Sequence, residues 1–418
     1  MNVTLRFRAY PDEDTASEAW RHIELHRQIR NHAVRDYYRS ARDDRPGKNQ
    51  QVNEFPGWKR RWPVFAGVSA HAAQQSVRQI HKDLSVLREH RRSGRRTGRL
   101  KWQGAGEFRS VAYQSEGFNV DHNTGQRYGT LRLSKIGEIR VRVHRELPDT
   151  EDVSHVVLKK ERTGEWYACF VVERDEPEKP DVANIDPNDC IGIDLGILSY
   201  IHTSDDLVVE CVDLDKEYDR YAREQRTLDR KEHGSARWEQ QRRKVAEAKR
   251  RIKRRVLDFQ QKLSTWLVKT YDAVFAEDLD VKPMLEGSQS AKNKQDAAWS
   301  RFLDLCEYKA DLYGTVFERV DARGTTKECN RCGVETSKPI WVREHSCPAC
   351  GYEADRDLNA ARNVLDRGIE KAEIGAGRPK LTPAETGVTT STDGGHAAVR
   401  VDANTVIETG SPVSPDTG

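Results

Sequence analysis

Four of the eight cysteines form one spaced pattern, and it constrains the fold of this 418-residue chain more than any other feature. The pattern reads C-x2-C-x14-C-x2-C, with a glycine after each pair, and its members are Cys329, Cys332, Cys347 and Cys350. Two residues between paired cysteines let both thiolates face a single ion, and the glycine lets backbone amides donate to the sulfurs. The N-terminal residues contain no apolar segment typical of a secretory signal, so we expect a metal site rather than disulfides.

Four thiolates make a closed tetrahedral site for one Zn2+, which stabilises the fold because no position remains for water. An iron centre with the same ligands is the alternative. The residues leave open whether this module touches nucleic acid or only stabilises the fold. The other cysteines have apolar sequence neighbours, and we expect core thiols at Cys169, Cys190, Cys211 and Cys306.

The chain carries 70 Lys and Arg against 67 Asp and Glu, but its basic residues are concentrated in two segments, 89–101 and 240–255. Both are rich in arginine, whose planar guanidinium donates two hydrogen bonds to a phosphate. Two such segments favour a polyanionic partner, and solvated helix faces are the alternative. The residues expected to contact nucleic acid are Arg91, Arg92, Arg95, Arg96, Arg242, Arg243, Lys244, Arg250, Arg251, Arg254 and Arg255. No run of about 18 apolar residues occurs, so we expect no membrane partner.

The first half of the chain combines alternating and helical patterns. Residues 1–10 alternate as a strand, 15–41 and 68–90 have helical character, and alternation returns between 131 and 172. The predicted architecture is a β-barrel-like domain over 1–10 and 95–178, with a helical insertion over 11–94. Residues 179–189 are rich in proline and acids, and we expect a linker there.

The second half predicts the order β-β-β-α-β-α-β-α over residues 190–370, an α/β domain. Its metal module, 325–353, interrupts the chain between the last strand and a final helix ending at Gly368. Residues 371–418 are rich in Gly, Pro, Thr and Asp, and we expect a disordered tail.

Carboxylates stand at the ends of these predicted elements. Asp194 follows the apolar run I-G-I, Glu277 ends A-V-F-A-E, and Asp355 and Asp357 precede the final helix. Each has a simpler alternative: a turn residue, a solvated strand end, or a helix N-cap. If the first and fourth strands are neighbours, Asp194 and Glu277 lie side by side and the last helix adds a third acid. Three acids without basic partners repel one another, and two Mg2+ ions would relieve this and support phosphodiester cleavage.

In this order the residues resemble the transposon-encoded TnpB (OrfB) family, relatives of the compact type V CRISPR effectors. The resemblance spans about residues 1–370. The matching motifs are L-R-L-S-K-I-G (131–137), E-W-Y-A-C-F (165–170), G-I-D-L-G (192–196), A-E-D-L-D-V-K-P-M (276–284), W-S-R-F (299–302), E-Y-K (307–309), C-N-R-C-G, C-P-A-C-G and D-R-D-L-N-A-A-R-N (355–363). The usual Thr-Ser before the first cysteine pair is Thr325-Thr326 here.

The resemblance implies an RNase H-like (RuvC) nuclease in the cytoplasm of a prokaryote, acting at the nucleoid. A guide RNA encoded by the element would pair with double-stranded target DNA beside a short flanking motif that the protein reads. The resemblance makes Asp194, Glu277 and Asp357 the catalytic acids that hold Mg2+, with Asp355 the competing third acid. It also places Asn359 and Arg356 near the site.

Two other functions remain open from the sequence: a nuclease-inactive, RNA-guided DNA-binding regulator, and an unguided transposase or recombination accessory protein. The presence of all three acids favours the nuclease. Trp58 and Trp62 in G-W-K-R-R-W-P could stack on bases, although packing within the protein is the favoured interpretation.

Overall fold

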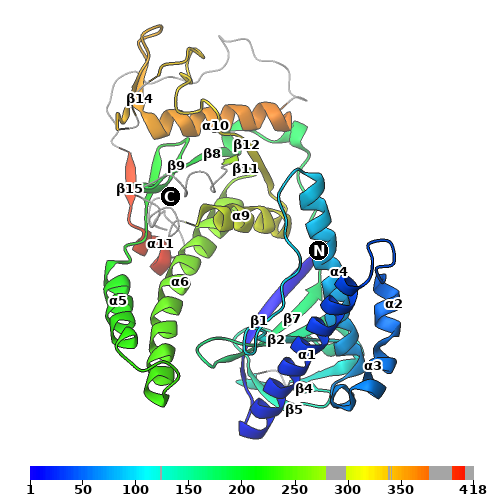
Figure 1. Cartoon of the computed structure of the whole chain (residues 1–418). Coiled ribbons are helices and arrows are strands. Elements are labelled where there is room, and N and C mark those ends of the chain that lie inside the picture. Colours follow the sequence, from blue (N-terminus) through cyan, green and yellow to red (C-terminus); the bar gives the residue numbers. More distant parts are fainter. Residues whose placement is uncertain (123–124, 279–297, 338, 340, 376–397, 410–418) are drawn as a thin grey trace. The chain divides into compact units, whose positions relative to one another are not determined.

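The structure is a computed structural model that describes residues 1–122, 125–278, 298–337, 339, 341–375 and 398–409. The chain divides into two compact units, Met1–Asp175 and Glu176–Gly418 (Figure 1). Among the described residues, no helix is long and apolar enough to cross a membrane.

The first unit contains a seven-stranded antiparallel sheet in the order β2-β6-β7-β1-β5-β4-β3. The strands are β1 (Asn2–Tyr10), β2 (Ser110–Gln114), β3 (Phe118–Asp121), β4 (Tyr128–Leu133), β5 (Gly137–Arg142), β6 (Val153–Lys160) and β7 (Trp166–Glu173). Alternate side chains of β1, including Leu5 and Phe7, are buried, so the N-terminal strand occupies a central place between β7 and β5. This near-barrel sheet confirms the predicted β-rich region.

Helices inserted between β1 and β2 form a second core in this unit. They are α1 (Glu13–Arg39), α2 (Lys48–Asn53), α3 (Phe55–Arg61) and α4 (Ala70–Arg92). The Asp12 carboxylate accepts a hydrogen bond from the Thr15 amide at 2.7 Å, which caps the start of α1. Trp58 is buried in this core and its ring lies 4.5 Å from the His32 ring, so it packs within the protein. Trp62 is half-buried beside the same histidine.

The second unit is built on a six-stranded mixed sheet in the order β12-β11-β8-β9-β10-β15. Its strands are β8 (Cys190–Leu195), β9 (Ser199–Thr203), β10 (Leu207–Glu210), β11 (Ala273–Asp278), β12 (Val316–Asp321) and β15 (Val399–Val401). The first three form an antiparallel meander, and β11 and β12 add in parallel on the other side of β8. The predicted sequence of strands is therefore confirmed. Residues 179–189 contain two 3-10 turns, η4 (Val182–Asn184) and η5 (Pro187–Asp189), and belong to this unit.

Helices cover both faces of this sheet (Figure 1). The helices are α5 (Asp215–Asp229), α6 (Ala236–Thr270), α9 (Trp299–Tyr313) and α10 (Arg356–Ala372). Phe259 and Leu263 of α6 and Phe302 of α9 pack against Ile193 and its neighbours on one face, while α10 lies on the other. α5 packs along α6 and was not predicted, because Leu228 is its one buried residue and its sequence carries no apolar stripe.

Two glycines let α10 lie directly against the sheet. A Cβ at Gly192 of β8 would overlap the backbone of Ala361 and Leu365, and a Cβ at Gly368 would overlap the ring of Phe275 in β11. The prediction that the last helix ends at Gly368 is wrong, since α10 continues to Ala372. This glycine serves close packing between helix and strand rather than termination of the helix.

The prediction of a disordered tail over 371–418 is wrong for the part that the structure describes. Residues 371–375 end α10 and its C-cap, and Val399–Val401 form β15, which pairs in parallel with β10. The helix α11 (Ala403–Thr409) then packs on α6, where Arg255 donates to Asn404 at 2.6 Å. The alternation of apolar residues could not predict this strand, because it has only three residues and forms by pairing with the edge of β10. Residues 376–397 and 410–418 lie outside the described residues.

Gly368→Ala tests whether close approach of α10 to β11 stabilises the unit. We expect the substitution to lower the free energy of unfolding by about 2 kcal/mol, because overpacking outweighs the better helix propensity of alanine. Gly57→Ala in α3 is the matched control, since its Cβ would meet nothing closer than Arg60 at 3.9 Å. Equal urea midpoints for Gly368→Ala and the unmodified chain would contradict this packing role.

Candidate active site

Asp194 and Glu277 lie at the carboxyl ends of neighbouring parallel strands. The register pairs Ile193 of β8 with Ala276 of β11, so the next residue of each strand is the acid. Alternation along the strands puts both acids on the face that α10 covers, together with Gly192. Both side chains are buried, Asp194 at 7% exposure and Glu277 at 5%, so neither is a solvated strand end.

The N-terminus of α10 contributes the third acid. Asp355 is the N-cap: its Oδ1 accepts from the Asp357 amide at 2.8 Å and from the Leu358 amide at 3.4 Å. Asp357 stands in the first turn and is 5% exposed. The helix-cap interpretation is therefore right for Asp355, and it leaves Asp357 as the buried carboxylate directed toward the strands.

The three acids influence one another electrostatically. Burial raises the pKa of Asp194 well above its usual range, and the negative charges of Glu277 and Asp357 raise it further. Burial also raises the pKa of Glu277, while the Thr325 hydroxyl and the Arg367 guanidinium oppose that rise. Two neighbouring strand acids with raised pKa values are typical of a site that needs a cation.

Basic residues lie beside one of the acids, so the repulsion among the three acids is partly offset. Arg343, between the two cysteine pairs, forms an ion pair with Asp357, and Arg356 Nε lies 3.4 Å from Asp357 Oδ1. The position of Arg356 agrees with the expectation that it lies near the site. No local pattern pointed to Arg343, because the fold of the cysteine module decides where its side chain reaches.

Thr325, the first residue of the Thr325-Thr326 pair, contacts the acid of β11. Its Oγ1 donates to Glu277 Oε1 at 2.5 Å, and the residue is 1% exposed. The departure from the usual Thr-Ser falls at the next residue, Thr326, which is exposed, so this contact comes from the threonine that both patterns share.

The two asparagines of N-A-A-R-N, Asn359 and Asn363, attach the cysteine module to α10. Asn359 accepts from the Asn330 amide at 3.0 Å and donates to the Glu328 carbonyl at 2.7 Å. Asn363 donates to the carbonyls of Glu328 at 2.7 Å and Thr325 at 2.8 Å. Asn359 therefore holds the first cysteine turn in place, two residues after Asp357 on the same helix.

The four cysteines converge in a geometry that fits a tetrahedral zinc site. All sulfurs lie within 4.8 Å of one another, with Cys329 Sγ 3.7 Å from Cys350 Sγ and Cys332 Sγ 3.5 Å from Cys347 Sγ. Tetrahedral Zn–S bonds of about 2.3 Å place sulfurs about 3.8 Å apart. Backbone amides of Cys350 and Ala349 lower the pKa of Cys347 to about 6, which favours the thiolate that a metal binds.

Beyond the first cysteine turn, the module closes with a short antiparallel hairpin. Its strands are β13 (Glu344–Ser346) and β14 (Glu353–Asp355), and the second leads directly into α10. Gly333 and Gly351 follow the cysteine pairs with positive φ angles of 74° and 71°, as the opened turns require.

None of the basic residues singled out above is buried. Arg91, Arg92, Arg95 and Arg96 are exposed at the end of α4 and just after it, and the second group lines α6. Several of them also have partners within the protein: Arg255 pairs with Glu217 at 2.7 Å, Arg242 pairs with Glu239 at 2.8 Å, and Arg91 donates to the Gly98 carbonyl at 3.0 Å. The motif A-E-D-L-D-V-K-P-M continues past Asp278 into residues 279–284, which lie outside the described residues.

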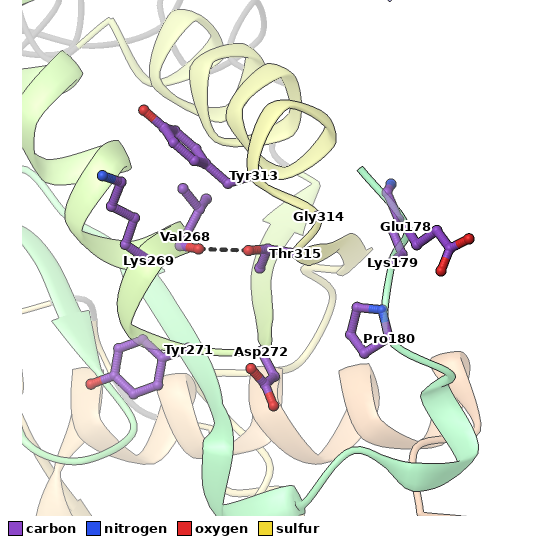
Figure 2. A pocket seen from close by; sticks show the side chains of 10 residues that line it. All are labelled: Glu178, Lys179, Pro180, Val268, Lys269, Tyr271, Asp272, Tyr313, Gly314 and Thr315. Carbon is purple, nitrogen blue, oxygen red and sulfur yellow. Dashed lines mark hydrogen bonds between the residues drawn. The ribbon is translucent and has the colours of Figure 1, made fainter. Parts of the chain in front are cut away.

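A polar pocket of about 580 Å³ lies at the opposite ends of the same strands (Figure 2). It is lined by Lys269, Tyr271 and Asp272 before β11 and by Tyr313 and Thr315 before β12. Glu277 lies five positions after Asp272 along the strand, or about 16 Å, so the pocket is distinct from the site of the three acids.

Comparison with known proteins identifies the family. The OrfB_IS605 family model, described as "Probable transposase", matches residues 169–287, and the Cas12f1-like TNB domain matches residues 299–364. The chain is 30% identical over 394 residues to a Streptomyces pristinaespiralis protein named as an RNA-guided DNA endonuclease, covering 91% of this chain and 93% of that one. This chain belongs to the TnpB (OrfB) family.

Other members and relatives agree. InsQ of Escherichia coli K12, also named as an RNA-guided DNA endonuclease, is 28% identical over 285 residues, covering 62% of this chain and 68% of InsQ. The structure of a Cas12f1–sgRNA–target DNA complex aligns with a TM-score of 0.53 at 13% identity, over 84% of this chain and 82% of that chain. The TnpB fold therefore extends through both units of this protein.

The raised pKa of Asp194 predicts that its charge destabilises the folded protein without added Mg2+. Between the ordinary pKa of an aspartate in the unfolded chain, about 4, and the raised pKa of Asp194 in the folded chain, the folded state binds more protons than the unfolded state. The unfolding free energy therefore falls as pH rises between these two pKa values. We expect Asp194→Asn to stabilise the chain, more at pH 8 than at pH 5, by about 1.4 kcal/mol for each pKa unit of the rise.

The exposed neighbour of Glu277 provides the control, since Asp278→Asn should change urea unfolding equally little at both pH values. Parallel pH profiles for Asp194→Asn and the unmodified chain would show that Asp194 carries no such penalty.

Proposed function

We propose that this TnpB-family chain is an RNA-guided DNA endonuclease that cleaves target DNA beside a short flanking motif. The observation that carries the proposal is the convergence of Asp194, Glu277 and Asp357 from two parallel strands and a helix N-terminus onto one edge of a sheet. The names of the relatives from Streptomyces and Escherichia coli support the same activity.

The nuclease domain is, on this proposal, RNase H-like (RuvC). The strand order β12-β11-β8-β9-β10, an antiparallel meander extended by two parallel strands, supports this assignment. The acids stand at the carboxyl ends of the parallel strands, where active sites of open α/β sheets form. The cysteine module between β12 and α10 would then be a zinc ribbon inserted in the nuclease domain.

Asp194, Glu277 and Asp357 would hold two Mg2+ ions, for which carboxylate oxygens are the preferred ligands. Bound Mg2+ would activate the attacking water and stabilise the leaving oxygen of the phosphodiester. The Thr325 hydroxyl fixes the orientation of Glu277, and Asn359 and Asn363 fix α10 relative to the first cysteine turn. Because burial raises the pKa of both strand acids, cation binding would release protons and strengthen as pH rises.

The guide RNA and double-stranded target DNA are the proposed partners. Neighbours in fold include complexes with both. The arginines of α6 and those near the end of α4 are accessible and would contact phosphates, so binding should weaken with added salt. We propose no role in membrane binding.

Cleavage by the reconstituted complex is the first test. The chain would be co-expressed with the DNA downstream of its gene, and the purified particle presented with Mg2+ and a plasmid library carrying a target and randomised flanks. We expect cleavage at one flanking motif, lost by at least about 1,000-fold in Asp194→Ala and in Glu277→Gln with the bound RNA retained.

Asp278→Asn is the matched control, since it changes the adjacent exposed acid of the same strand and should cleave normally. A bound RNA without cleavage by the unmodified complex would favour a guided, inactive DNA binder. Undiminished cleavage by Glu277→Gln would refute the assignment of the acids.

Zinc is tested separately. Cys329 is buried, so Cys329→Ser should lower the melting temperature and reduce bound zinc from one ion per chain, because a closed site contributes folding free energy. Cys169→Ser, a half-buried cysteine in β7, is the control and should keep zinc at one per chain. A melting temperature and zinc content unchanged in Cys329→Ser would contradict the structural site.

A further inference from the structure

His202 of β9 is the cross-strand partner of Asp194. The antiparallel register pairs these two residues directly, so their side chains lie on the same face of the sheet, beneath α10. The imidazole is buried, with 4% of its side chain exposed. A buried histidine at this position is close to the acids and has no part in the mechanism proposed above.

Each nitrogen of this imidazole faces a different aspartate. Nε2 lies 2.9 Å from Asp206 Oδ1, a hydrogen-bond distance, and Nδ1 lies 3.7 Å from Asp355 Oδ1, which is too long for one. An ionised carboxylate only accepts, so Nε2 carries the proton that Asp206 binds. In that tautomer of the neutral ring, Nδ1 presents a lone pair toward the Asp355 carboxylate, and a metal cation between the two atoms would turn this repulsion into attraction.

The surroundings match a metal site rather than an isolated histidine. Ligand atoms of His202, Asp355 and Asp357 all lie within 4.8 Å of one another. A carboxylate that accepts the proton of the second ring nitrogen is the usual support of a metal-binding histidine, and Asp206 has that position here. Asp357 also pairs with Arg343 and Arg356, but each carboxylate oxygen has two lone pairs and can accept an arginine N–H and a cation together.

We propose that His202, Asp355 and Asp357 form a divalent cation site with one imidazole ligand, oriented by Asp206. Imidazole favours transition metals over Mg2+, so the ion of this site would be of the Mn2+ or Zn2+ class. The inference rests on the proposed function, because it shares Asp357 with the proposed Mg2+ site. It adds a nitrogen ligand that the three acids alone do not supply.

Mn2+ is the probe, added to the full-length, zinc-loaded chain purified without a histidine tag. Pulsed electron paramagnetic resonance detects nitrogen bound to Mn2+ as a modulation of the echo. We expect this modulation in the unmodified chain, its loss in His202→Asn, and its retention in His155→Asn, which changes a half-buried histidine of β6.

A second variant keeps the test independent of any folding defect in His202→Asn. Asp206→Asn retains the imidazole and removes its supporting carboxylate, and we expect Mn2+ to bind this site about 10- to 100-fold more weakly. Unchanged affinity there, or modulation that is absent in the unmodified chain or persists in His202→Asn, would overturn the proposal. His202 would then be a structural residue of β9, held by its hydrogen bond to Asp206.

These results separate the two proposals. Oxygen-only Mn2+ ligation together with guided cleavage would remove the histidine site and leave the nuclease standing. Nitrogen ligation without cleavage would support the histidine site and count against the nuclease.

Discussion

The direct packing of α10 on the sheet is the constraint on which the second unit depends. It requires the absence of a side chain at Gly192 and Gly368, because a Cβ at either position would overlap the opposing element. This close approach brings the helix N-terminus, with Asp357, to the strand ends that carry Asp194 and Glu277. The first glycine of G-I-D-L-G therefore serves packing, two residues before the acid it accompanies.

The same helix connects the acids to the cysteine module. Asn359 and Asn363 bind the backbone of the first cysteine turn, and Thr325 just before that turn donates to Glu277. A shift of the module would therefore displace Thr325, and with it the hydrogen bond that Thr325 donates to Glu277. The contacts of Asn359, Asn363 and Thr325 would therefore connect the zinc-stabilised module to the acids and help to position them.

Burial of these carboxylates has a cost in stability. Desolvation and mutual repulsion raise the pKa of Asp194, so ionising it at neutral pH destabilises the fold until a cation neutralises the cluster. Arg343 and Arg356 pair with Asp357 and also oppose the rise in the pKa of Asp194, so they offset part of the charge of the cluster. Sites that bind cations commonly carry such a penalty in stability, because the carboxylates that attract the cation repel one another when no cation is bound.

Local sequence alone determined most of the strands, the spacing of the cysteines and the family motifs, because each depends on neighbours along the chain. Tertiary structure decided the rest: Arg343 and His202 beside the acids, the path of α10 through Gly368, and the added strand β15. The physical reason is that these contacts join segments far apart in sequence, and they are fixed by strand register and helix packing, which no local pattern encodes.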